Sequence, residues 1–250
     1  MALVRPRFLC DNIFNPVHYP TVTLSANEAT SGHEAQFFAT LRREDSWIPT
    51  TANNDAWLKA QHPVPRTFDM ICLWVHNLLG KAYKFQCSDD NFTTIQTVVD
   101  VTIPTGPGTG SPDDALGVVT EDLMWIKTVS PRSAVDFRHF VPAMGANLKP
   151  SLSGIVGLSY YPSQYDYPYA PSTTTLQAEE HVSDRGVRGL GTVANPRHGD
   201  ITLKLRTDFE YELARFHFEQ RWGGWAPSPM LIIHDTQQAE RAVMADRTGG

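Results

Sequence analysis

The chain has 250 residues, enough for one large β domain or two smaller ones, and carries a formal net charge of −6. Hydrophobic residues make up 41% and charged residues only 19%, and 18 prolines and 17 glycines favour many short strands over a helical fold. The negative charge and the lack of any Lys/Arg run argue against a nucleic-acid-binding protein, which needs clustered cations to displace phosphate counterions.

The cysteines and the N-terminus bear on the compartment in which the chain folds. Cys10, Cys72 and Cys87 are too few and too scattered for a disulfide framework or a zinc site, and we predict Cys72 and Cys87 as small core residues. The N-terminal MALVRPRFLC lacks the apolar region of a signal peptide, and no stretch approaches the roughly 20 apolar residues that span a bilayer. We therefore expect folding in a reducing cytoplasm and no membrane insertion.

Alternating or β-rich apolar stretches predict strands in the first part of the chain, where 31–45 favours at best a short helix and 104–117 a long exposed loop. The stretch 68–75 (FDMICLWV) is apolar on both faces, so we expect it at the centre of a sheet. The predicted strands, whose spacing suits a β-sandwich, are 21–26, 68–75, 82–87, 94–103, 123–129 and 134–140.

A hairpin is predicted around residue 90. Residues 82–87 place Tyr83, Phe85 and Cys87 on one side of their strand. The Ser-Asp-Asp-Asn sequence at 88–91 then supplies side chains that bond their own downstream backbone, which closes the turn.

The second part of the chain has a different character. Strands are predicted within 152–161 and over 201–206 and 229–234, with loops or short hairpins over 183–199 and a short helix over 237–246. The clearest helix follows Thr207, which forms a capping box with Glu210, and it should end at Gly223. Its apolar residues recur at helical spacing: Phe209, Leu213 and Phe216.

A loop rich in tyrosine and proline, YYPSQYDYPYAP, follows the first of these strands. Its rings either pack onto their own domain, form a contact surface for another protein, or stack against sugar rings, since tyrosine combines a large apolar area with a polar tip. Trp225 is open to the same core or contact interpretation. The candidate interaction surface comprises Tyr161, Tyr165, Tyr167, Tyr169 and Trp225.

No catalytic, cofactor-binding or metal-ligating set can be nominated from the sequence. The chain contains no G-x-S-x-G, P-loop, H-E-x-x-H or C-x-x-C motif. The acidic pairs Asp89–Asp90, Asp113–Asp114 and Glu179–Glu180 are more typical of solvated turns than of calcium sites. His76 follows a core strand and is interpreted as a hydrogen bonder that stabilises a turn. We predict that the chain is not an enzyme and holds no cofactor.

Two stretches resemble proteins of tailed bacteriophages. The sequences WIPTTANNDAWLKA, FDMICLWVHNLLG and AYKFQCSDDNFTTIQTV, in this order, resemble a galactose-binding-like (discoidin-like) jelly roll as it occurs in phage virion proteins. Residues 151–236, with ITLKLR, DFEYELARFHFE and a closing LIIHDT, resemble a module of distal tail and tail-tip components. No sugar or calcium ligand of the jelly-roll family maps onto a matching position, so ligand binding is not implied by the resemblance.

These resemblances imply a mainly β fold with two parts. The first, 1–145, is expected to be a galactose-binding-like jelly-roll β-sandwich. The second, 146–250, is expected to be a smaller α+β portion with one clear helix near 208–222, packed against the first part or completing it.

The function implied is that of a structural component of a phage virion, assembled in the host cytoplasm and located in the tail tip or baseplate. Its expected partners are other tail or baseplate proteins and further copies of itself in a ring. Two alternatives stay open: a carbohydrate-binding module that attaches the particle to a glycan on the host surface, and a head or capsid decoration protein.

Overall fold

Most of the described chain is β-strand, and every pairing in it is antiparallel. In this computed structural model the described residues are 7–40, 45–145, 147–160, 172–173, 178–182, 188–192, 197–198, 216, 230–233 and 243–245. The elements are β1 (Arg7–Leu9), β2 (Thr23–Ala26), the 3₁₀ helix η1 (Ala35–Ala39), β3 (Ala56–His76), β4 (Ala82–Ser88), β5 (Gln96–Thr102), β6 (Val118–Val119), β7 (Trp125–Val141), β8 (Leu152–Gly157), β9 (Ser172–Thr173), β10 (Ala178–Val182), β11 (Arg188–Thr192), β12 (Arg197–His198), β13 (Met230–Ile233) and β14 (Val243–Ala245).

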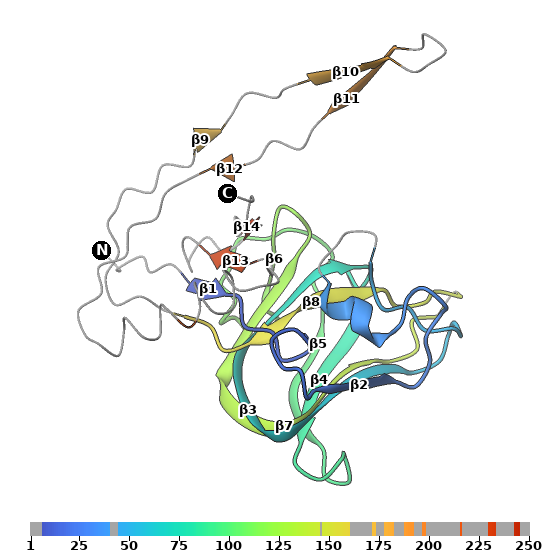
Figure 1. Cartoon of the computed structure of the whole chain (residues 1–250), viewed down its shortest axis with the longest axis vertical. Coiled ribbons are helices and arrows are strands. Elements are labelled where there is room, and N and C mark those ends of the chain that lie inside the picture. The colour runs from blue at the N-terminus through green and yellow to red at the C-terminus, as the bar shows by residue number, and fades with distance from the viewer. Residues whose placement is uncertain are drawn as a thin grey trace, which may run out of the picture.

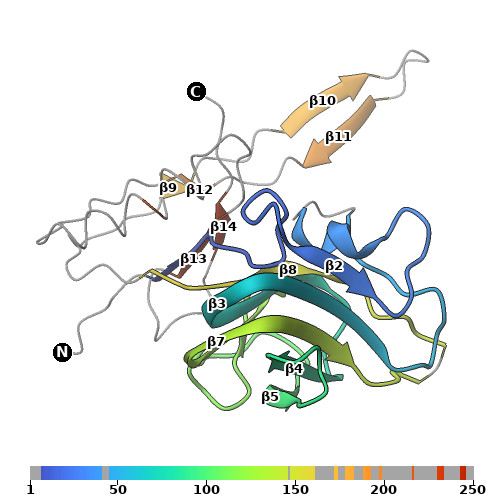
Figure 2. The ribbon, with the colours of Figure 1, turned by 60° about the horizontal axis from the view of Figure 1, so that its bottom comes forward.

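Two long neighbouring strands, β3 with 21 residues and β7 with 17, run through both layers of a sandwich. The first half of β3 and the second half of β7 form one layer with β2, β4 and β5. The other two halves form a second layer with β6 and β8. Figures 1 and 2 show β3 and β7 curving together from one layer into the other. The predicted β-sandwich is therefore confirmed.

Prolines mark the places where these long strands bend. The pairing of β3 with β7 shifts register between Gln61 and Arg66, and Pro63 and Pro65 lie inside that interval. A second shift lies opposite residues 128–132 of β7, which include Pro131. A proline cannot donate a ladder hydrogen bond, so it is tolerated where pairing is interrupted, and the interruption lets the strand bend.

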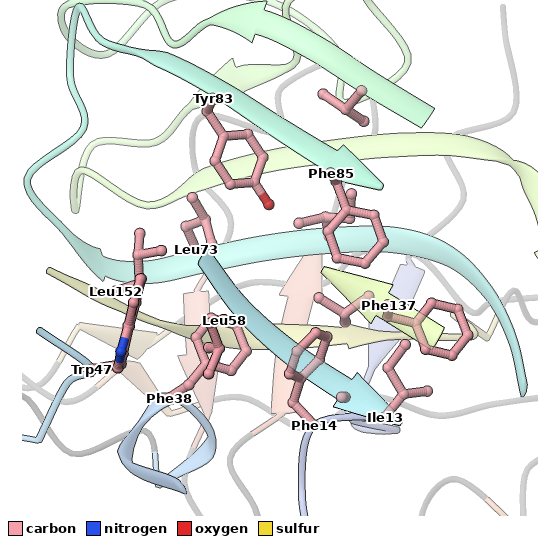
Figure 3. Close-up of a cluster of buried hydrophobic side chains, with 14 of the residues drawn as sticks. Ile13, Phe14, Phe38, Trp47, Leu58, Leu73, Tyr83, Phe85, Phe137 and Leu152 are labelled. Atoms are coloured by element: carbon pink, nitrogen blue, oxygen red, sulfur yellow. The ribbon is translucent and has the colours of Figure 1, made fainter. Parts of the chain in front are cut away.

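The main core lies between the two layers and is rich in aromatic rings (Figure 3). Alternation places Leu58 of β3 and Tyr83 and Phe85 of β4 in it, all with no exposed surface. Phe38 of η1 closes one side, and Leu152 of β8 enters from the second layer. The predicted inward side of residues 82–87 is thus confirmed, including Cys87, which is 1% exposed.

A second core covers the opposite face of the second layer. Strands β1, β13 and β14 form a small sheet, whose Leu9 and Leu231 pack with Met70 and Cys72 of β3. Ile71 and Leu73 point the other way, into the main core. The prediction that 68–75 is apolar on both faces because it lies centrally is confirmed, and Cys72 is a core residue with a free thiol.

The later part of the chain contributes strands to this architecture. β8 pairs with β3, and β13 pairs with β1, so segments from both sides of residue 145 share sheets. The expected short helix over 237–246 is wrong for Val243–Ala245, which are the strand β14, because there they pair with β13. Apart from Phe216, the predicted helix near 208–222 lies outside the described residues, as does the strand 201–206. The division into 1–145 and 146–250 stays a prediction. None of the helices in the described ranges is both long and apolar enough to cross a bilayer.

Candidate functional site

The interaction surface predicted from the sequence, formed by Tyr161, Tyr165, Tyr167, Tyr169 and Trp225, lies outside the described residues and stays a prediction. The tyrosine before it, Tyr160, is described and is a core residue with 1% of its surface exposed. Its backbone pairs with Phe8, and the two rings stack with centroids 6.2 Å apart.

The histidines that could serve a reaction are buried in structural positions. Burial lowers the pKa of His139 to about 3, because its ring lies between Phe14, Phe38 and Phe85. Burial also lowers the pKa of His76 to about 4, and its Nδ1 accepts a hydrogen bond of 3.2 Å from the backbone N–H of Leu78. The interpretation of His76 as a turn-stabilising residue is confirmed, and both imidazoles are neutral at pH 7.

The acidic pairs that are described serve turns and loops. Asp90 accepts hydrogen bonds from Ser88 Oγ at 2.7 Å and from the backbone N–H of Thr94 at 2.8 Å, and these bonds lower the pKa of Asp90 to about 2. Asp113 and Asp114 belong to the loop before β6. Within the described ranges, no three His, Cys, Asp or Glu side chains are grouped as metal ligands would be.

The solvent side of the first layer carries a row of aromatic and cationic side chains. Ala56, Leu58 and Ala60 of β3 point into the core, so Trp57 and Lys59 point outward. On β7, Phe137 and His139 are buried, so Arg138 and Phe140 point outward. Trp57 is the direct cross-strand partner of Phe140, and Lys59 is that of Arg138. Directly opposite residues on one face of a sheet have Cβ atoms about 5 Å apart, so the two aromatic side chains are immediate neighbours.

The turn after β4 folds over the solvent side of this layer and contacts both β7 and β3. Its backbone N–H at Asn91 donates to Asp136 Oδ2 of β7 at 2.8 Å, and Lys59 Nζ reaches Asn91 Oδ1 at 2.7 Å. Phe92 has a φ of +64°, a conformation that costs energy for a bulky residue. The Cζ atom of Arg138 lies over the Phe92 ring, 4.4 Å from its centroid. Strained backbone conformations such as that of Phe92 are concentrated at functional sites.

Hydrogen bonds hold the polar side chains of this surface in place. The Arg138 guanidinium donates from Nε and Nη2 to Gln86 Oε1, at 2.9 and 2.6 Å, and lies 5.6 Å from the Phe140 ring centroid. Burial lowers the pKa of Arg138, but from so high an ordinary value that it stays charged. Lys84, opposite Phe140 on β4, forms an ion pair of 2.8 Å with Asp100. We call the set Trp57, Lys59, Lys84, Phe92, Arg138 and Phe140 the aromatic face.

Sequence reasoning does not nominate the aromatic face. Trp57 could have been found, because residues 56–61 alternate between small or apolar and larger or polar side chains. Trp57 lies on the side of this strand that faces away from the core. Its partner Phe140 cannot be found in this way, since only the register of β3 with β7 brings the two together. The aromatic face offers half-buried aromatic rings beside cations that are held by the Gln86 carboxamide and the Asp100 carboxylate. This combination suits a ligand with an apolar face and hydroxyl groups.

No protein-family model matches this chain, and no curated protein matches it. Among solved structures, the chain is similar to chitosan-binding module 2 in complex with chitotriose, derived from a chitosanase/glucanase of Paenibacillus sp. IK-5. Identity is 17%, coverage is 58% of this chain and 99% of that chain, and the TM-score is 0.44.

Two other similar structures come from different proteins. The family 32 carbohydrate-binding module of C. perfringens NanJ in complex with galactose is 11% identical, with coverage of 56% of this chain and 92% of that chain and a TM-score of 0.39. A GH29 fucosidase from Ruminococcus gnavus in complex with fucose is also 11% identical. There the coverage is 58% of this chain but 27% of that chain, and the TM-score is 0.45.

Proposed function

We propose that this chain is a non-catalytic carbohydrate-binding module and that the aromatic face is its binding surface. The observation that carries the proposal is the direct pairing of Trp57 with Phe140 on the solvent side of the sheet. A pyranose ring has an apolar face of C–H groups that packs on an aromatic ring, while its hydroxyl groups require hydrogen-bond partners.

The polar part of the aromatic face meets the second requirement. Lys59, Lys84 and Arg138 surround the two rings, and each is held by a hydrogen bond to a neighbour on the protein. Side chains that are already fixed lose less conformational freedom on binding, so more of the interaction energy remains for affinity. An extended sheet surface of this kind suits several consecutive sugar units better than a single buried one.

The experiment that tests the proposal is a calorimetric titration of the full chain with chitotriose and with galactose oligosaccharides, preceded by a glycan array. These sugars are the first probes because similar structures hold chitotriose and galactose. We expect Trp57→Ala and Phe140→Ala each to weaken binding at least tenfold, which corresponds to about 1.4 kcal/mol. Both side chains are half-buried on the solvent side, so the melting temperature should change by only a few degrees.

Phe37→Ala is the matched control, because Phe37 is also a half-buried aromatic residue but belongs to η1, away from the aromatic face. It should leave glycan affinity unchanged. A blank array, or equal affinities for the Trp57 variant and the parent chain, would refute the proposal.

The biological setting of this module is a separate proposal. The sequence resemblance to phage virion proteins supports attachment of a particle to the surface of its host. Assembly into a tail tip or baseplate, a homo-oligomeric ring and a head-decoration role stay predictions. Imaging of the native particle with this chain labelled would locate it.

A further inference from the structure

A polar pocket of about 520 Å³ lies away from the aromatic face, at the bend of β7. This volume is within the range of small-molecule sites, which is roughly 300–1,000 Å³. None of the lining residues belongs to the aromatic face. The described residues that line the pocket are Arg7, Val98, Asp113, Lys127, Thr128, Val129, Ser130 and Arg132.

The inner wall of the pocket is a buried ion-pair network. The guanidinium of Arg7, which is 6% exposed, donates to Asp69 Oδ2 at 2.8 Å and to Ser159 Oγ at 2.7 Å. The backbone N–H of Ser159 donates to Asp69 Oδ1 at 2.7 Å, so the carboxylate is held from two sides. Buried charges that are satisfied in this way are rigid, and the network therefore fixes the back of the pocket.

Asp113 forms a side wall and is the one carboxylate among the described lining residues. Its Oδ1 accepts a hydrogen bond from Thr128 Oγ1 and lies 3.7 Å from Nη1 of Arg7. The loop that carries it is tied to β7, because the backbone N–H of Thr128 donates to the carbonyl of Pro112 at 2.9 Å. With 64% of its side chain exposed, Asp113 keeps acceptor capacity for a ligand hydroxyl.

The other two cations that line the pocket, Lys127 and Arg132, are held less firmly than Arg7 by the described residues. Among the described residues, the hydrogen-bond partner of Lys127 Nζ is the carbonyl oxygen of Pro112, at 3.4 Å. In the described part of the chain, the Arg132 guanidinium has neither a hydrogen-bond acceptor nor an ion-pair partner. Burial lowers the pKa of Lys127, with Asp113 and Asp114 opposing the shift, so its charge is partly desolvated and would gain from an anionic ligand.

We propose that this pocket binds an acidic sugar, a uronic acid whose carboxylate pairs with Lys127 and Arg132 and whose hydroxyl groups pair with Asp113 and Ser130. Arg7 is already paired with Asp69, so Lys127 and Arg132 face one lining carboxylate, Asp113, and the one remaining positive charge favours a ligand of single negative charge. Asp113 distinguishes a sugar acid from a bare anion: its carboxylate attracts a hydroxyl group but repels phosphate or sulfate. The site is separate from the aromatic face and does not depend on the function proposed for that surface.

The test is a titration of the full chain with galacturonate, with neutral galactose, and with inorganic phosphate. We expect galacturonate to bind at least tenfold more tightly than galactose, and Lys127→Met with Arg132→Met to abolish that preference. Lys81→Met is a matched loss of a lysine charge outside the pocket and should have no effect. Trp57→Ala should leave galacturonate binding intact, so failure of one site is distinguishable from failure of the other.

Asp113→Asn supplies the discriminating measurement. For an acidic-sugar site it should weaken galacturonate binding several-fold and tighten phosphate binding. Tighter binding of both ligands would show a general anion site and overturn the proposal. The proposal is also overturned if phosphate binds the parent chain as well as galacturonate does, or if galacturonate does not bind a folded chain.

Discussion

His139 lies at the centre of the main core, where a titratable side chain is least expected. Its ring centroid is 4.4 Å from that of Phe38 and 4.6 Å from that of Phe14, and its Nδ1 forms a 2.7 Å hydrogen bond with the Tyr83 hydroxyl. Burial lowers the pKa of His139 to about 3, while in an unfolded chain it is about 6.5. Between these values the unfolded state binds a proton that the folded state excludes, so stability falls as pH falls.

We predict that His139→Phe makes the chain less sensitive to acid. From pH 7 to pH 5, the linkage for one such histidine is about 2 kcal/mol of unfolding free energy, and the variant should lose that much less than the parent chain. At pH 7 the variant should be about 1–3 kcal/mol less stable, because the Tyr83 hydroxyl loses its partner. Urea denaturation at the two pH values measures both effects.

Tyr83→Phe is the control for this comparison, since it removes the same hydrogen bond but keeps the imidazole. It should show the parent's full loss of stability in acid. If His139→Phe and Tyr83→Phe respond equally to pH, the burial of a neutral imidazole is not the source of the acid sensitivity.

At the scale of single elements, β8 shows how a glycine within a strand allows the backbone of a neighbouring strand to approach closely. Gly154 pairs with Leu73 of β3, and a Cβ at that position would overlap the Cys72 carbonyl oxygen and lie 3.2 Å from Leu73 Cα. These are backbone atoms of a strand paired on both sides, so they cannot move aside as a flexible side chain could.

We predict that Gly154→Ala destabilises the chain by about 3 kcal/mol, because β8 must separate from β3 to admit the methyl group. Gly106→Ala is the matched control, since a Cβ added there would have no heavy atom within 4 Å and stability should change by less than about 0.5 kcal/mol. The midpoint of urea unfolding compares the two. Equal stabilities for both variants would contradict the close packing of β8 on β3.

The same element scale shows which strands can be predicted from the sequence. Residues 68–75 are predictable as a strand because a nearly continuous apolar run indicates burial on both faces. Residues 82–87 are predictable because alternating apolar residues indicate burial on one face. The continuity of β3 through 62–67 is not, because Pro63 and Pro65 indicate a break in the sequence. For the same reason, the sequence predicts two strands over 123–129 and 134–140, whereas these residues belong largely to the single strand β7. A proline marks an interrupted ladder, and it does not say whether the chain then turns away or only bends.

At the scale of the whole molecule, both candidate sites depend on contacts between distant parts of the sequence. Trp57 meets Phe140 through the register of two bent strands, and Arg7 meets Asp69 through the docking of the small sheet. Side-chain type and spacing are local signals, so they predict the strands but neither site.

The two cores make a prediction about how the molecule opens. Leu231 of β13 is fully buried against the second layer, in the same cluster as Cys72, whereas Cys87 belongs to the main core. A charge at position 231 should release the small sheet while the sandwich stays folded. We therefore expect Leu231→Asp to expose the Cys72 thiol to alkylation, with Cys87 still protected, as read by mass spectrometry of labelled peptides. Ile95→Asp, at a residue already 48% exposed, should label neither cysteine. Labelling of Cys72 and Cys87 at the same rate in the Leu231 variant would mean that both cores unfold as one cooperative unit.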